Sequence, residues 1–235
     1  MKRIFLVGFC VAVLSMSLQA QEEKTVPLDS LPFDIQKQAF IYTTSLRYND
    51  PIIARMALYN LLAYNPGNTA VLDSLALSYI DARQYPSAVL ASQDALRIDP
   101  KDMLATEIAA VSFESLGLKD RAISYYETMY LSNNDINVLY KIGFIQFDLK
   151  RYNEALSSAD IIIGDASAAK ENIIFQKNER ENQEVSMVAA AYRLKAMIYE
   201  AQGSVDQAKE QYNKALELAP DFALAKMQLE ELNKG

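Results

Sequence analysis

The sequence predicts an all-α fold, a right-handed α-solenoid of about five helix–turn–helix units with a capping helix at its C-terminal end. The first observation is a recurring alanine: Ala54, Ala88, Ala122, Ala155 and Ala208 are separated by 34, 34, 33 and 53 residues. The second is that each alanine stands at the same place in a helical pattern of apolar residues. The third is that prolines close several of the units, where they stop a helix. A fixed period of roughly 20 to 50 residues indicates stacked supersecondary units rather than one closed domain.

The stretches that begin at Thr69 and Ala189 show the pattern most clearly. In each, apolar residues at helical spacing predict a first helix, a short turn follows, and a second helix ends at a proline. The matching residues are Leu72, Leu75, Ala76, Tyr79, Ala88, Ala95 and Pro100 in the earlier stretch, and Tyr192, Ala196, Tyr199, Gly203, Ala208, Tyr212, Ala215 and Pro220 in the later one. The shared alanine is small because the two helices are expected to cross closely there.

This pattern resembles the tetratricopeptide repeat, whose period is about 34 residues. The resemblance covers residues 35–222, apart from one insertion, as units 35–68, 69–102, 103–135, 136–169 and 189–222. Two units depart from the pattern: Asn134 replaces a closing proline, and Gln146 stands where an aromatic residue is usual. The resemblance implies an extended concave surface that binds proteins or peptides.

The N-terminal residues predict export. Residues 1–20 are typical of a secretory signal peptide, with Lys2 and Arg3 before an apolar run and a small-residue end at Ala20. An uncleaved membrane anchor is the alternative, although the apolar run is short for a bilayer span. Residues 21–34 are predicted to form a flexible leader.

An insertion and a terminal helix complete the organisation. Residues 164–188 break the repeat phase, and we expect either a long loop or an N-terminal extension of the helix that follows. Ile173, Ile174 and Phe175 indicate that part of this insertion docks in an ordered way. Residues 223–235 alternate apolar and charged groups, which predicts a helix that caps the array.

The composition argues against several functional classes. The chain has no histidine, and its one cysteine, Cys10, lies in the predicted signal peptide. The mature chain therefore lacks the residues of the common catalytic triads and zinc sites, so we expect no enzyme activity, metal or cofactor. Without Lys2 and Arg3, 21 basic residues face 30 acidic ones. This net charge of −9 argues against a nucleic-acid partner. No later segment predicts a membrane span.

The candidate site is the concave face, which the family resemblance places mostly on the first helix of each unit. The residues carried over are Asp73, Leu77, Asp81, Glu107, Val111, Glu114, Tyr140, Phe144, Phe147, Asp148, Arg193 and Met197. They predict an acidic and aromatic groove for a peptide with apolar anchors and basic flanks. The alternative is that the apolar groups pack against neighbouring units and the carboxylates form a solvated face. Tyr140, Phe144 and Phe147 favour the groove, because an exposed aromatic patch usually marks a binding surface.

Together these observations predict a non-catalytic protein–protein interaction module or adaptor in the bacterial periplasm or cell envelope. Its partner would be a protein or peptide segment, basic or apolar in character. We expect Phe144→Ala or Asp81→Lys to weaken partner binding without unfolding the array. The main alternative is a structural envelope component that self-associates through residues 35–66 or the insertion. An enzyme or glycan-binding protein that uses the carboxylates of the groove is less favoured.

Overall fold

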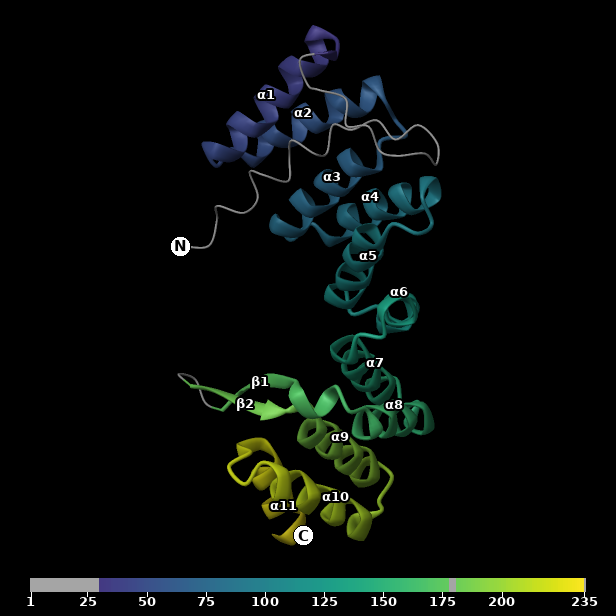
Figure 1. Ribbon diagram of the computed structural model, residues 1–235, viewed down its shortest axis with the longest axis vertical. Coiled ribbons are helices and arrows are strands. Elements are labelled where there is room, and N and C mark those ends of the chain that lie inside the picture. Colours follow the sequence, from purple (N-terminus) through teal and green to yellow (C-terminus); the bar gives the residue numbers. More distant parts are fainter. Residues whose placement is uncertain (1–29, 178–180, 235) are drawn as a thin grey trace. The chain divides into compact units, whose positions relative to one another are not determined.

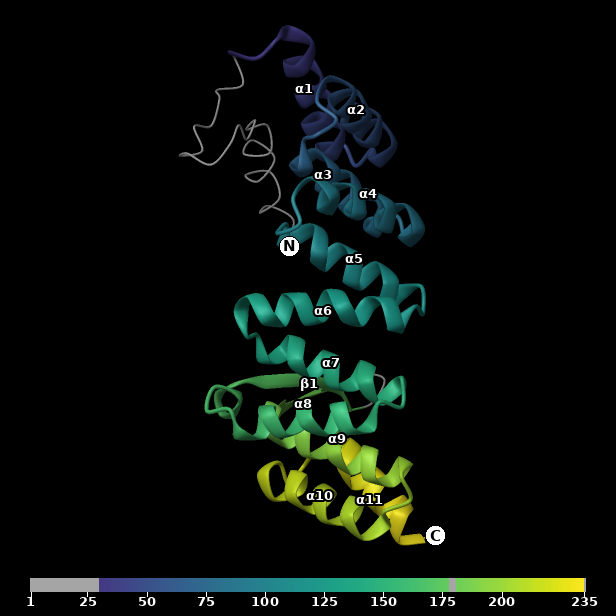
Figure 2. The same ribbon diagram turned by 90° about the vertical axis from the view of Figure 1, so that its right-hand side faces the viewer.

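The computed structural model of the protein describes residues 30–177 and 181–234 (Figures 1 and 2). The predicted signal peptide, residues 1–20, and residues 21–29 of the predicted leader lie outside the described residues. The chain divides into two compact units, which we call the N-terminal block, up to Ala122, and the C-terminal block, from Ile123 onward. None of the described helices combines the length and apolar character needed to cross a bilayer.

Helical hairpins build the N-terminal block. Its helices are α1 (Phe33–Arg47), α2 (Pro51–Tyr64), α3 (Thr69–Asp81), α4 (Tyr85–Ile98), α5 (Met103–Ser115) and the start of α6 (Lys119–Asn133). Helix α1 packs on α2, α3 on α4, and α5 on both α3 and α4. The side chains of Asp50, Asn68 and Asp102 accept hydrogen bonds from backbone N–H groups in the first turns of α2, α3 and α5. These caps satisfy donors that a helix start leaves unpaired, so each hairpin has a defined beginning.

The turn inside each helical hairpin reverses the chain at a left-handed residue. In the N-terminal block these residues are Asn49 (φ 58°), Arg83 (φ 55°) and Gly117 (φ 74°). Lys150 (φ 59°) and Gly203 (φ 76°) take the same role in the C-terminal block. Glycine adopts this conformation at little cost, whereas arginine and lysine are strained by their Cβ atoms. The same local geometry thus recurs although the turn sequences differ.

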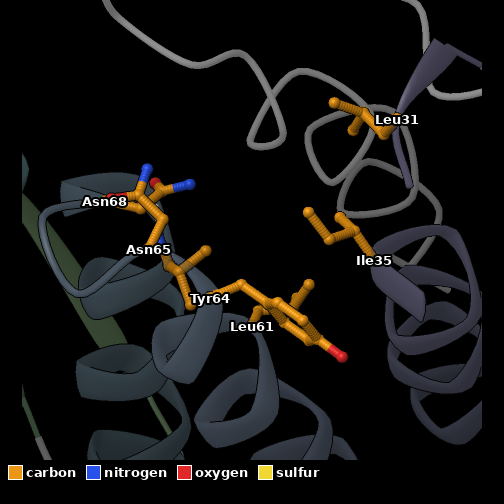
Figure 3. A pocket seen from close by; sticks show the side chains of 7 residues that line it. Leu31, Ile35, Leu61, Tyr64, Asn65 and Asn68 are labelled. Atoms are coloured by element: carbon orange, nitrogen blue, oxygen red, sulfur yellow. Dashed lines mark hydrogen bonds between the residues drawn. The ribbon is translucent and has the colours of Figure 1, made fainter. Parts of the chain in front are cut away.

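A small hollow lies beside the start of α1 and the loop between α2 and α3. Figure 3 shows the side chains around it. They are Leu31, Ile35, Leu61, Tyr64, Asn65, Asn68 and Val71. The hollow holds about 20 Å³, which is room for roughly one water molecule. It is therefore a gap in the packing and too small for an organic ligand.

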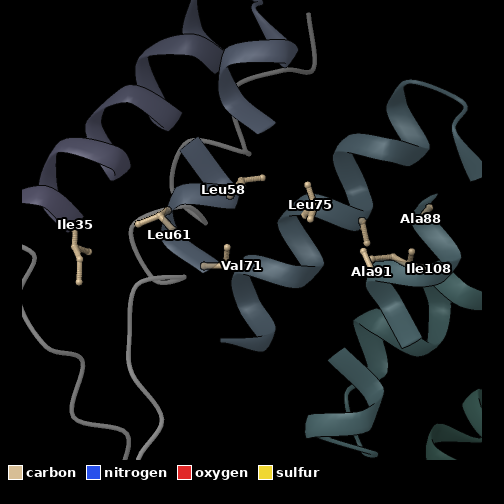
Figure 4. Packing of buried hydrophobic residues seen from close by; sticks show 9 residues of the cluster. Ile35, Leu58, Leu61, Val71, Leu75, Ala88, Ala91 and Ile108 are labelled. Atoms are coloured by element: carbon tan, nitrogen blue, oxygen red, sulfur yellow. The ribbon is translucent and has the colours of Figure 1, made fainter. Parts of the chain in front are cut away.

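The core of the N-terminal block runs along the contacts between successive hairpins. Leu58, Val71, Leu75 and Ile108 belong to one buried cluster, and Ala88 lies among them (Figure 4). The recurring alanines Ala54, Ala88 and Ala122 are all buried. Because methyl groups fill these positions, the helix backbones approach closely, as the sequence period predicts.

The C-terminal block combines helices with a β-hairpin. Its elements after α6 are α7 (Ile136–Asp148), α8 (Tyr152–Gly164), a short 3₁₀ helix η3 (Ala168–Lys170), β1 (Asn172–Gln176), β2 (Asn182–Ser186), α9 (Met187–Ala201), α10 (Val205–Leu218) and α11 (Ala223–Lys234). Helix α7 packs on α8, α8 on α9, α9 on α10, and α10 on α11. Ala155 and Ala208 are buried, like their counterparts in the N-terminal block.

Two residues of α7, Gln146 and Gly143, make close contacts with the helices that follow. Gln146, which replaces the usual aromatic residue, is buried, and its Oε1 atom accepts a hydrogen bond of 2.7 Å from Ser158 on α8. Gly143 lies close to both Ser158 and Leu194 of α9. The hydrogen-bonded pair of Gln146 and Ser158 thus stands where three other units carry an aromatic residue, Tyr79, Phe113 or Tyr199.

The insertion forms an antiparallel β-hairpin, and both expectations for it, a long loop or a helix extension, are wrong. In its register Ile173 pairs with Val185 and Phe175 with Gln183. These four side chains are buried or half-buried, whereas Ile174 between them is 63% exposed. Side chains that are buried or half-buried at every second position fit a strand with one covered face better than a helix.

Candidate functional site

In the C-terminal block, the β-hairpin covers predicted groove residues. Arg193 and Tyr140 are only 8% and 6% exposed. The Arg193 guanidinium carbon lies 5.7 Å from the ring centre of Phe175 in β1 and 5.9 Å from that of Phe222, which precedes α11. Its Nε donates a hydrogen bond of 2.7 Å to Gln228 of α11. Arg193 is therefore held between the hairpin and α11.

Polar and aromatic contacts fasten the hairpin to the turn between α10 and α11. The Gln183 side chain donates to the Asp221 carbonyl at 2.7 Å and accepts from the Ala223 N–H at 3.1 Å. The rings of Phe175 and Phe222 are 5.0 Å apart, within the range of favourable aromatic pairs. The contact thus joins the insertion to the turn that leads into α11.

The predicted aromatic patch on α7 is not an exposed surface, and this expectation is wrong. Tyr140 packs edge-on against Phe144 at 5.0 Å and belongs to a buried cluster with Met187. Burial raises the pKa of the Tyr140 hydroxyl. Phe144 and Phe147 are half-buried and pack against the core formed by α8 and α9. Phe144→Ala would therefore remove core contacts, and this substitution should destabilise the C-terminal block.

The remaining two predicted residues of this block differ in exposure. Met197 is half-buried and packs against the cluster around Tyr212. Asp148, at the end of α7, is exposed. The Tyr212 hydroxyl donates a hydrogen bond of 2.8 Å to Glu200. Of the six predicted groove residues in this block, five are therefore buried or half-buried in packing contacts, and Asp148 alone is exposed.

In the N-terminal block, five predicted residues lie on the neighbouring helices α3 and α5 and are at least partly open. Leu77 is 37% exposed, and Asp81 and Glu107 are exposed. Val111 and Glu114 are half-buried. Leu77 and Val111 occupy equivalent positions in two successive units. Because α3 contacts α5, we call these two residues, together with the carboxylates Asp81, Glu107 and Glu114 one helical turn from them, the open strip.

Asp73 does not belong to this open strip. Its side chain is buried, and its Oδ1 atom has no hydrogen-bond partner among the described residues. Burial, together with the nearby carboxyl groups of Asp102 and Asp99, raises the pKa of Asp73 to about 8. At neutral pH this carboxyl group is therefore mostly protonated and adds little negative charge to the surface.

Sequence reasoning missed an exposed apolar face on the first hairpin. Ile52, Met56 and Tyr59 are all more than half exposed and lie three or four residues apart on α2. The Tyr59 hydroxyl forms a hydrogen bond with the Tyr79 hydroxyl. The sequence of α2 could have indicated this face, because its apolar residues lie on every side of the helix. A helix that buries one side needs only a single apolar stripe, so some of these residues must be exposed.

The described residues contain no arrangement suited to a metal. Within residues 30–177 and 181–234, no group of three or more His, Cys, Asp or Glu side chains is placed to hold one. What the structure presents instead is a series of packed helical hairpins with shared alanine contacts and repeated turns. These features define a helical repeat protein.

Comparisons with known proteins specify the class further. Tetratricopeptide repeat models match residues 74–135 and residues 189–222. A comparison with curated proteins finds no match. The chain therefore contains tetratricopeptide repeats in these two stretches, as its residue pattern predicts.

Three solved structures illustrate the shared fold. The MamA protein is 19% identical, over 81% of this chain and 94% of that chain, with a TM-score of 0.61. A tetratricopeptide repeat protein from Parabacteroides merdae is 18% identical, over 86% of this chain and 73% of that chain, with a TM-score of 0.62. YrrB, described as a tetratricopeptide repeat protein with an unusual peptide-binding site, is 16% identical, over 83% and 93% of the two chains, with a TM-score of 0.63. At these identities the likeness concerns the fold.

Proposed function

We propose that this protein is a non-catalytic adaptor that binds a peptide or protein segment along α3 and α5. The observation that carries the proposal is the partly open strip of Leu77 and Val111 with Asp81, Glu107 and Glu114 beside it. Apolar side chains on successive helices suit the anchors of an extended or helical segment. The carboxylates favour lysine or arginine at its flanks.

The family and the fold support this reading. Tetratricopeptide repeats generally serve as interaction scaffolds without catalysis, and YrrB, of the same fold, is described as having a peptide-binding site. In the C-terminal block Tyr140 and Arg193, which occupy the position of Glu107 in their units, are buried, and Arg193 lies under the chain's own hairpin. The proposed binding surface is therefore the N-terminal part of the predicted groove.

We also propose that the protein acts in the bacterial periplasm or at the cell envelope. The support is the sequence of residues 1–20, with its basic start, apolar run and small-residue end. An adaptor at that location would bring together components of envelope assemblies.

Site-specific photo-crosslinking in the native envelope tests the binding surface. A photoreactive residue at position 77 should capture one defined protein, because Leu77 lies in the proposed strip. The matched control is position 90 on α4, where Leu90 is also an exposed leucine. Asp81→Lys should reduce the capture from position 77 by about tenfold, because it places a positive charge beside the basic flank of the partner.

Two results would contradict the proposal. One is equal capture of the same protein from positions 77 and 90. The other is capture from position 77 that Asp81→Lys leaves unchanged, since the carboxylate would then have no part in recognition.

A further inference from the structure

The outer edge of β1 has no hydrogen-bonding neighbour among the described residues, because the sheet contains β1 and β2 alone. At the two ends of the hairpin, Met187 donates to Glu171 and Lys177 donates to Glu181, each at 2.9 Å between backbone atoms. Bonded and non-bonded pairs alternate along an antiparallel ladder. Every second residue of β1 therefore points its N–H and C=O groups away from β2. These residues are Asn172, Ile174 and Gln176.

The order of residues along β1 is self-complementary about Ile174. When two copies of the strand lie antiparallel with Ile174 opposite Ile174, Asn172 faces Gln176 and Glu171 faces Lys177. The outward backbone groups then meet in register, and each facing pair exchanges two hydrogen bonds. Opposite charges meet at both ends of the paired strands.

The side chains at the paired positions suit this arrangement as well. Ile174 is 63% exposed and would contact its own counterpart across the two-fold axis. Lys177 has a weak contact with Glu181 at 3.5 Å, and both side chains are about half exposed. An exposed pair of this kind contributes little, so Lys177 can turn toward Glu171 of a second copy at low cost.

The outer edge of β2 lacks this complementarity. Its outward residues are centred on Glu184, which would face Glu184 of the second copy. Like charges directly opposite one another destabilise a strand pair. Gln183 also ties β2 to the Asp221–Ala223 turn. In Figure 1 β1 lies on the side of the hairpin farther from α11, where its outward residues are exposed.

We propose that two copies of this chain associate through antiparallel pairing of their β1 edges, which joins the two hairpins into one four-stranded sheet. The two-fold axis passes beside Ile174, and the Glu171–Lys177 pairs fix the register. A closed two-fold contact of this kind yields a dimer rather than an open filament. This inference is independent of the groove on α3 and α5.

Sedimentation of the full chain over a range of concentrations tests the proposal. The wild-type chain should show a monomer–dimer equilibrium. Ile174→Pro removes an outward N–H group and leaves the ladder with β2 intact, as proline is tolerated at a sheet edge. It should weaken dimerisation at least about tenfold, since two intermolecular hydrogen bonds are lost. Glu184→Pro, the same change at the edge of β2, should leave the dimer unaffected.

A charge exchange tests the register. Lys177→Glu should weaken the dimer, because it places two carboxylates opposite each other. The double variant Glu171→Lys with Lys177→Glu should restore it. Thermal unfolding followed by circular dichroism confirms that each variant is folded.

Three results would overturn the proposal. The first is a wild-type chain that stays monomeric at every concentration. The second is a dimer that Ile174→Pro and Glu184→Pro affect equally. The third is a dimer that Lys177→Glu weakens and the double variant does not restore, since pairing with a strand of another register or another protein would behave in that way.

Discussion

Replacing Phe222 with alanine should lower the free energy of unfolding of the C-terminal block by about 3–5 kcal/mol. The Phe222 ring is fully buried. It lies 5.0 Å from the Phe175 ring and faces the Arg193 guanidinium. Its removal would leave a cavity at the point where the hairpin, α9 and the start of α11 meet. Urea unfolding followed by circular dichroism measures the effect.

The matched control for Phe222→Ala is Leu218→Ala. Leu218 is also a large apolar residue near the end of α10, but it is exposed, so its truncation should change stability by less than about 0.5 kcal/mol. Equal and small effects of the two substitutions would contradict the role of Phe222 as the anchor of the hairpin.

Replacing Gly143 with valine should cost about 1–3 kcal/mol of stability. A Cβ atom at this position would lie 2.9 Å from Leu194 Cδ2 and 3.4 Å from Ser158 Cβ. Valine adds two further methyl groups at the contact of α7 with α8 and α9. The strain outweighs the roughly 0.5–1 kcal/mol that a helix gains when an interior glycine is replaced. Thermal or urea unfolding measures the change.

Gly164→Val provides the control for the crowding at Gly143. Gly164 ends α8, and a Cβ atom there would meet no atom within 4 Å. This variant should stay within about 0.5 kcal/mol of the wild type. If Gly143→Val were equally neutral, the close approach of α7 to α9 would be refuted.

The fold could be predicted from the sequence because contacts that recur in the structure require the same residue type at a fixed interval in the sequence. A position where two helices cross must stay small, so Ala88 and Ala122 recur 34 residues apart and are both buried. The sequence of the hairpin shows no comparable repeated pattern. Its strands are five residues long, and their covered face shows as alternation only once the pairing of Ile173 with Val185 is known.

The candidate site could be predicted only in part. The repeat positions identify which face of a helix should be concave, but they do not show whether another segment of the chain covers that face. Leu77 and Asp81 are exposed as the positions imply. Arg193 occupies a matching position but is covered by Phe175, which comes from an insertion outside the repeat. Asp73 is buried beside Asp102. The two residues are 29 positions apart in the sequence, so they are not equivalent positions of successive repeats, and the repeat pattern does not predict their contact.

Hydrogen exchange of the hairpin amides tests most directly whether the insertion is a folded cover of the C-terminal block. The N–H groups of Phe175 and Val185 point into the ladder and should exchange slowly, opening together with α9. The N–H of Glu184 points outward on an exposed residue and should exchange fast. Rapid exchange at Phe175 and Val185 while α9 stays protected would show that the hairpin does not cover Arg193, and would contradict the structure of this site.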